Sequence, residues 1–176
     1  EKISYRTSGS GIPITGIMFR PGTADWYDGD IHRGFSRDRL SGWNLKGMGN
    51  TLGMDHENAH VDHQGLYRYH AVSPSLASDL KSSLIGYAPD GFEIHYIGAN
   101  AVLSWRLKSG NRLSEPYGSH DGTYKQDYQY VNGLGNLVEC KGTMSQSRYI
   151  YFSTDAYPFF PRCFIGAVSQ QFLRRL

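Results

Sequence analysis

The segment from Asp55 to His63 holds the densest group of side chains that could bind a metal ion or transfer a proton. If this segment were helical, His56, His60 and His63 would share one face, at a spacing that suits metal binding. The segment also matches the H-E-x-x-H pattern of zinc peptidases, in which the carboxylate of Glu57 would act as general base. It lies between two glycines and lacks the apolar stripe of a buried helix, so a solvated loop with one structural histidine is the alternative.

A second group of such side chains lies on an expected strand over residues 66–72. The alternation of a strand places Arg68 and His70 on one face, and Tyr67 and Tyr69 on the other. A guanidinium binds phosphate or carboxylate through two parallel hydrogen bonds, and an imidazole exchanges a proton near neutral pH. The pair therefore indicates a site for an anionic substrate. The alternative is an arginine that faces solvent beside a histidine bonded to the backbone.

A mainly β fold is expected to position these side chains. The 176 residues correspond to a single domain over residues 1–176, and the 21 Gly, 13 Tyr and short alternating segments predict a β-rich α+β architecture with long loops. One short helix is predicted near residues 74–85, where Ser73 suits the N-cap and Pro74 the first helical position. Residues 170–176 fit a short C-terminal helix. No apolar run approaches the length of a membrane span.

Charge and cysteine content narrow the function classes. The net charge of +2 permits binding to a polyanion without requiring it. There is no phosphate-binding P-loop, dinucleotide fingerprint or G-x-S-x-G motif, so no organic cofactor is expected. Cys140 and Cys163 either remain free thiols or form a disulfide, which would contribute about 3 kcal/mol. We favour the disulfide, and with it an extracellular location, because the chain begins at Glu1 without a hydrophobic leader, as a processed chain does.

A series of separated motifs occurs in order along the chain. They are Ile14–Phe19 with Pro21-Gly22, Leu52–Asp55, Ala59–Val61, Gly65–His70, Ile85–Phe92, Asp121–Tyr124, Glu139–Gly142, Tyr149–Phe152, Tyr157-Pro158 and Arg162–Gly166. Together they resemble the YHYH domain family over about residues 12–166. The name motif reads Tyr67-Arg68-Tyr69-His70 here, with one histidine replaced, and the later copy, Tyr149-Ile150-Tyr151-Phe152, has lost both histidines. The resemblance implies a secreted, β-rich single domain and no settled reaction.

Residues at the matched positions supply the candidate site. They are His60, His70, Asp90, Asp121, Glu139 and the two cysteines. With the neighbouring arginine added, the predicted catalytic residues are His60, His70, Arg68, Asp90 and Glu139. For a divalent cation (Mg²⁺, Ca²⁺ or Zn²⁺) the predicted ligands are Asp55, His60 and Asp121, which offer carboxylate and imidazole donors.

The function that these residues predict is hydrolysis of phosphodiester bonds by a secreted monomer. It would be a non-specific DNase-type toxin whose partner is DNA or another polyanion. His60 or His70 would activate water as general base, and Arg68 would stabilise charge on the phosphoryl oxygens. The carboxylates would orient the histidine or hold the cation.

Two other functions stay open. One is a secreted module that binds a metal or a carbohydrate without catalysis, since many aromatic residues and Gly-rich loops suit sugar stacking and the family histidines are missing. The other is a metallopeptidase that acts through His56, Glu57 and His60.

Overall fold

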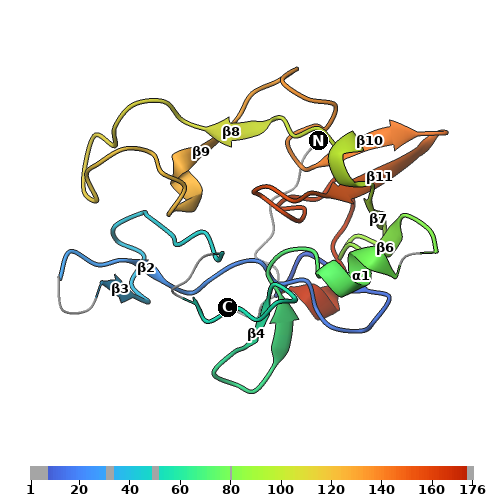
Figure 1. The fold of residues 1–176 in the computed structure, drawn as a ribbon, viewed down its shortest axis with the longest axis horizontal. Helices are drawn as coiled ribbons and strands as arrows, with labels where there is room; N and C mark the ends of the chain where they lie inside the picture. Colours follow the sequence, from blue (N-terminus) through green and yellow to red (C-terminus); the bar gives the residue numbers. More distant parts are fainter. Residues whose placement is uncertain (1–7, 31–33, 49–51, 80, 174–176) are drawn as a thin grey trace.

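The largest element of the fold is a five-stranded sheet (Figure 1). The computed structural model describes residues 8–30, 34–48, 52–79 and 81–173. The sheet order is β1 (Ile12–Pro13), β6 (Leu84–Tyr87), β7 (Glu93–Tyr96), β11 (Arg148–Ser153) and β10 (Gly142–Ser145). β7 and β11 are parallel, and the other neighbours are antiparallel. Residues 97–147 therefore form a long connection between two adjacent parallel strands.

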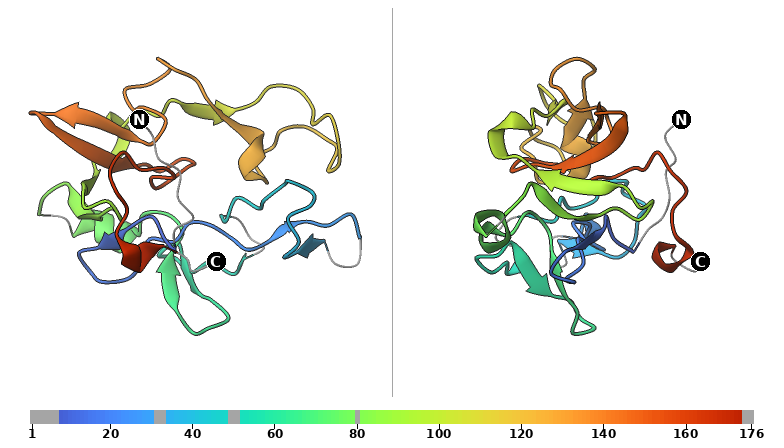
Figure 2. Two further views of the ribbon diagram at one scale, coloured as in Figure 1. Left: turned by 180° about the vertical axis from the view of Figure 1, so that it is seen from behind. Right: turned by 90° about the vertical axis from the view of Figure 1, so that its right-hand side faces the viewer.

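Three two-stranded ribbons accompany this sheet within the described residues. They are β2 (Trp26–Tyr27) with β3 (Phe35–Ser36), β4 (Ala59–Val61) with β5 (Tyr67–Tyr69), and β8 (Trp105–Leu107) with β9 (Tyr128–Tyr130). The helical elements are α1 (Pro74–Ser78) and three short 3-10 turns, η2 (Gly98–Asn100), η3 (Lys125–Asp127) and η4 (Gln170–Phe172). The β4–β5 hairpin projects from one side of the molecule, and the β8–β9 ribbon lies on the opposite side (Figures 1 and 2).

The prediction of a mainly β fold with long loops is confirmed, but the helix is shorter than expected. It begins as predicted, because the Ser73 hydroxyl accepts a hydrogen bond from the Leu76 amide (3.0 Å). It ends at Ser78, and the last two residues of the predicted segment, Leu84 and Ile85, belong to β6, where Ile85 is fully buried. Pairing with β1 and β7 overrides the local helical preference. The predicted C-terminal helix is only the turn η4, and residues 174–176 lie outside the described residues.

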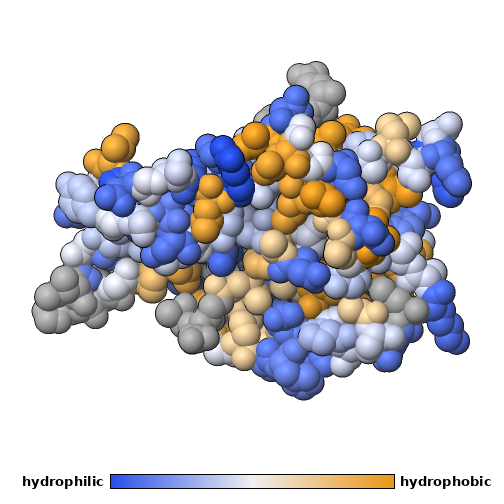
Figure 3. All heavy atoms as spheres, turned by 45° about the horizontal axis from the view of Figure 1, so that its top comes forward, coloured by the Kyte–Doolittle hydropathy of each residue, from blue (hydrophilic) through white to orange (hydrophobic). Residues whose placement is uncertain are grey.

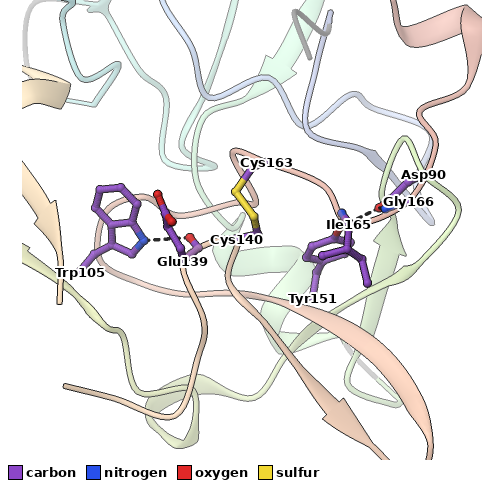
Figure 4. Close-up of a disulfide and its surroundings, with 8 residues drawn as sticks. All are labelled: Asp90, Trp105, Glu139, Cys140, Tyr151, Cys163, Ile165 and Gly166. Atoms are coloured by element: carbon purple, nitrogen blue, oxygen red, sulfur yellow. Dashed lines mark hydrogen bonds between the residues drawn. A yellow bond between two sulfur atoms is a disulfide. The ribbon is translucent and has the colours of Figure 1, made fainter. Parts of the chain in front are cut away.

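The main apolar core joins residues from both ends of the chain. Phe19 and Phe160 are fully buried, and their rings stack with centroids 4.2 Å apart. Tyr151 of β11 is also fully buried. The predicted disulfide between Cys140 and Cys163 is present and belongs to the same core cluster (Figure 4). It ties the C-terminal part of the chain to the loop that precedes β10.

The disulfide is expected to make a measurable contribution to stability. The double substitution Cys140→Ser/Cys163→Ser should lower the free energy of unfolding by about 3 kcal/mol, because the cross-link removes conformational entropy from the unfolded chain. Urea denaturation of the oxidised protein and of the variant measures this difference. Reduction of the wild-type protein should produce the same loss, and a reductant should leave the variant unchanged. Equal unfolding free energies for variant and wild type would contradict the prediction.

The surface mixes apolar and polar side chains. On the face drawn in Figure 3, apolar groups are separated from one another by hydrophilic ones. Leu40 and Leu113 are almost completely exposed, and each comes from a loop. Within the described part of the chain, no helix has both the length and the apolar composition needed to cross a membrane.

Candidate functional site

The β4–β5 hairpin positions the residues of the first candidate site. In the antiparallel pairing, His60 stands opposite Arg68. Asp62 shapes the turn, since its Oδ1 accepts the amide hydrogens of Gln64 (2.9 Å) and Leu66 (3.1 Å). Residues 56–58 form a turn and residues 59–61 a strand. The helix that would align three histidines, or an H-E-x-x-H zinc site, is therefore not formed.

Two histidines and one arginine gather on one face of the hairpin, as strand alternation predicts for Arg68 and His70. The Arg68 Nη2 atom lies 3.2 Å from His60 Nε2, and the ring centroids of His60 and His70 are 4.7 Å apart. A guanidinium only donates hydrogen bonds, so Nε2 of His60 is the acceptor and its neutral form carries the proton on Nδ1. This arrangement places a basic imidazole nitrogen directly beside a fixed positive charge.

Asp62 holds two arginines in place. Its Oδ2 atom lies 3.1 Å from Arg20 Nη1 and 3.8 Å from Arg68 Nη1, and its side chain is almost completely buried. Burial opposes ionisation of Asp62, but the turn amides and the two guanidinium groups outweigh it and lower the pKa of the carboxyl. Sequence reasoning did not single out Arg20 or Asp62. Arg20 lies 42 residues before its partner and carried no local signal.

The two histidines have different access to solvent. His60 is half-buried, and burial followed by the Arg68 charge lowers its pKa from the ordinary value. His70 is fully buried, and burial, the Arg68 charge and then the His60 charge lower its pKa to about 3. At neutral pH, His70 is therefore a neutral side chain that packs behind His60.

A cavity of about 820 Å³ opens beside the hairpin. The segment from Arg20 to Trp26 and the residues around Pro161 also line it. Six basic side chains among the described residues line this cavity: Arg20, Arg37, Arg39, Arg68, Lys125 and Arg162. His60 and His63 line it as well, whereas Asp25 and Asp62 are its carboxylates. Six cations face two carboxylates, so the cavity is suited to an anionic ligand.

Two of these basic residues come from distant parts of the chain. Lys125 begins η3, and its amide donates to the carbonyl of Asn44 (2.9 Å). Arg162 directly precedes the disulfide-bonded Cys163. Arg162 fell within one of the motifs quoted from the sequence but had no predicted role, and Lys125 lay in no such motif. Their common position in the cavity depends on tertiary structure alone.

The predicted carboxylates lie elsewhere. Asp90 Oδ2 accepts hydrogen bonds from the Tyr151 hydroxyl (2.7 Å) and the Gly166 amide (3.1 Å), and Glu139 lies on the other side of the disulfide in Figure 4. The Glu139 carbonyl accepts a hydrogen bond from the indole of Trp105 (3.0 Å). Neither residue lines the cavity.

The three predicted metal ligands, Asp55, His60 and Asp121, each form contacts with different residues. Asp55 accepts a hydrogen bond from the Tyr67 hydroxyl (2.6 Å), on the face of the hairpin opposite His60. Asp121 pairs with Arg112 (2.6 Å) in a separate charge cluster. Throughout residues 8–30, 34–48, 52–79 and 81–173, no three His, Cys, Asp or Glu side chains gather as a metal site would require.

Comparison with known proteins places the chain in a family. A family model described as YHYH protein matches residues 2–166. The chain belongs to the YHYH protein family. No curated protein and no solved structure matches it significantly.

The two YHYH motif copies have different surroundings in this member of the family. The first copy, Tyr67–His70, supplies Arg68 to the cavity and His70 to the layer behind it. The second copy, Tyr149–Phe152, lies on β11, where the Tyr151 hydroxyl holds Asp90. Only the first copy of the YHYH motif therefore contributes a side chain to the cavity.

Proposed function

We propose that this protein hydrolyses phosphodiester bonds of nucleic acid, with the scissile phosphate bound in the basic cavity beside the β4–β5 hairpin. The observation that carries the proposal is the excess of cations over carboxylates around a half-buried imidazole, His60. The planar fork of donors on arginine matches the geometry of phosphate groups as well as that of carboxylates. An imidazole within reach of such a group is the most common general base in proteins.

The reaction uses groups that already contact one another. Arg68 and Arg20, both anchored on Asp62, would donate to the phosphoryl oxygens and stabilise the charge that develops there. Once Arg68 turns its donors to the phosphate, Nε2 of His60 is free to take a proton from the attacking water. The water oxygen forms the new bond to phosphorus, the ester bond breaks, and the departing oxygen takes a proton from solvent. None of these steps requires a divalent cation. The cation expected from the sequence remains a prediction.

A second candidate is a module that binds an acidic carbohydrate without catalysis. The contact that favours it is the hydrogen bond from Arg68 to His60 Nε2, which occupies the lone pair that a general base needs. Trp26 also lines the cavity, and the Arg39 guanidinium carbon lies 5.9 Å from the centre of its ring. An aromatic ring beside an arginine suits a sugar that carries sulfate or carboxylate groups.

The setting that we propose is extracellular. The disulfide supports it, because such bonds persist in oxidising compartments. A secreted monomer that cuts DNA without sequence preference could act as a toxin.

Cleavage of supercoiled plasmid tests the proposal directly. We expect the wild-type protein to nick plasmid, and both Arg68→Ala and His60→Gln to lower the rate by at least about 100-fold. Arg106→Ala is the matched control, since Arg106 is an exposed arginine of β8 that does not line the cavity. Because the pKa of His60 is below its ordinary value, the imidazole is deprotonated at pH 7, and raising the pH further should not accelerate cleavage.

The same assay separates the alternatives. EDTA sensitivity would support the predicted cation. If DNA and RNA stay intact under all conditions, with and without added metal, the nuclease proposal is overturned. The carbohydrate-binding module then remains, and binding to a sulfated polysaccharide tests it. Equal cleavage by His60→Gln and wild type would overturn the role of His60.

A further inference from the structure

Lys125 and Arg162 line the same cavity as the hairpin site, but they come from other elements. If a Cβ atom were added at Gly22, it would lie 3.8 Å from Lys125 Nζ, so the amine reaches toward the cavity segment around Gly22. The Arg162 guanidinium carbon lies 5.4 Å from the ring centre of Tyr157, and Nε lies 3.5 Å from the carbonyl of Pro158. The disulfide at the next residue fixes this part of the chain.

The charges of these two side chains are not balanced by carboxylates. Among the described residues, neither Lys125 nor Arg162 forms an ion pair with Asp or Glu. The Arg162 Nη2 atom is shielded from solvent and makes no hydrogen bond to a described residue. A buried guanidinium nitrogen without an acceptor carries a large desolvation cost. An anion bound at this place would remove that cost.

Arg112 and Arg20 show how other arginines of the protein are compensated. Arg112 is almost completely buried, and it donates to both carboxylate oxygens of Asp127. Arg20 is paired with Asp62 in the hairpin half of the cavity. Among the described residues, Arg20 and Arg68 of the lining therefore share Asp62, whereas Lys125 and Arg162 have no carboxylate partner.

The electrostatics of Lys125 agree with this geometry. Burial, followed by the charges of Arg162 and Arg39, lowers the pKa of the Lys125 amine to about 7. Asp25, Asp62, His60 and His63 are the other titratable groups in the lining besides the basic residues, among the described residues. An anion beside the amine would raise its pKa again and would keep it protonated at neutral pH.

We infer that Lys125 and Arg162 form a second anion subsite in the cavity, so that the ligand is a polyanion with one charged group at the hairpin and another at this pair. The inference rests on the proposed function, which it deepens by requiring a substrate with at least two phosphate groups. A single nucleotide linkage would fill only one of the two positions.

Binding of short oligonucleotides tests the subsite. By isothermal titration calorimetry, the wild-type protein should bind a thymidine trinucleotide, with two phosphodiesters, at least about 10-fold more tightly than a dinucleotide with one. Lys125→Met should reduce this ratio to about twofold, the statistical factor for a ligand with two phosphodiesters that binds at a single subsite. Lys46→Met is the matched control, because Lys46 is also partly buried but contacts the Tyr128 hydroxyl outside the cavity lining. An unchanged ratio in Lys125→Met would overturn the subsite.

A second readout does not depend on nuclease activity. At pH 7.5, acetic anhydride should acetylate the Lys125 amine faster than that of Lys46, as quantified by mass spectrometry, and inorganic phosphate should slow only the reaction at Lys125. Protection by phosphate in a protein that cleaves no nucleic acid would support the subsite and overturn the nuclease alone. Absence of protection, together with an unchanged oligonucleotide ratio, would overturn the subsite even if the nuclease is real.

Discussion

Asp127→Asn is expected to lower the free energy of unfolding by about 3–5 kcal/mol, because it leaves a buried arginine without its main counter-charge. Asp127 is fully buried, and its carboxylate accepts hydrogen bonds from Arg112 Nε (2.8 Å) and Nη2 (2.7 Å) and from the amides of Gly122 and Tyr124. Its Oδ1 atom also lies 3.0 Å from Nδ1 of His120. An amide at this position would offer one acceptor atom and turn two hydrogens toward these donors.

The pKa of Asp127 records the same balance. Burial opposes its ionisation, but the hydrogen bonds from Arg112 and from the Tyr124 amide outweigh burial and lower the pKa to about 2. Urea denaturation at pH 7 measures the effect of the substitution. Asp121→Asn is the control, since Asp121 contacts the same arginine but its side chain is half exposed, so we expect a loss below about 1 kcal/mol. A loss below about 1 kcal/mol for Asp127→Asn would contradict the argument.

The same cluster gives Asp121, which the sequence predicts as a metal ligand, an arginine as its partner. Asp121 belongs to a motif matched in the YHYH family, and a carboxylate in a polar loop is a reasonable candidate ligand. The partner that decides its role, Arg112, lies nine residues earlier in a segment with no periodic pattern. The guanidinium carbon of Arg112 also lies 5.1 Å from the ring centre of Tyr124. The role of such a carboxylate depends on contacts that spacing does not encode.

Local patterns succeeded where backbone geometry alone decides the outcome. Strand alternation predicted that Arg68 and His70 share a face, and both side chains lie beside His60 in the structure. The helix prediction was too long because Leu84 and Ile85 belong to β6, which pairs with β1 and β7. The basic cavity was not predictable, since Lys125 and Arg162 lie far from the hairpin in the sequence.

His70→Phe is expected to make the protein relatively more stable as the pH falls. The folded protein holds His70 neutral with a pKa of about 3, whereas the unfolded chain takes up a proton near pH 6.5. Between these values the unfolded state binds more protons, so the free energy of unfolding of the wild-type protein decreases with acidification. Phenylalanine does not take up a proton, so the variant lacks this decrease in the free energy of unfolding. The free energy of unfolding of the variant minus that of the wild type should therefore be about 3 kcal/mol larger at pH 4 than at pH 7.

The surroundings of His70 limit what the ring contributes at neutral pH. The Gly47 backbone is a hydrogen-bond partner of the ring and lies close to Nδ1, so an apolar ring of similar shape should lose one hydrogen bond, at a cost of about 1–2 kcal/mol. Urea denaturation of the wild-type protein and of His70→Phe from pH 4 to 7 tests this. His70→Phe should also retain plasmid cleavage, because His60, not His70, lines the cavity. A stability difference independent of pH would show that the pKa of His70 is similar in the folded and unfolded states and would contradict the prediction. Loss of cleavage beyond about 10-fold would indicate that His70 takes part in the reaction, since proton transfer contributes at least that much.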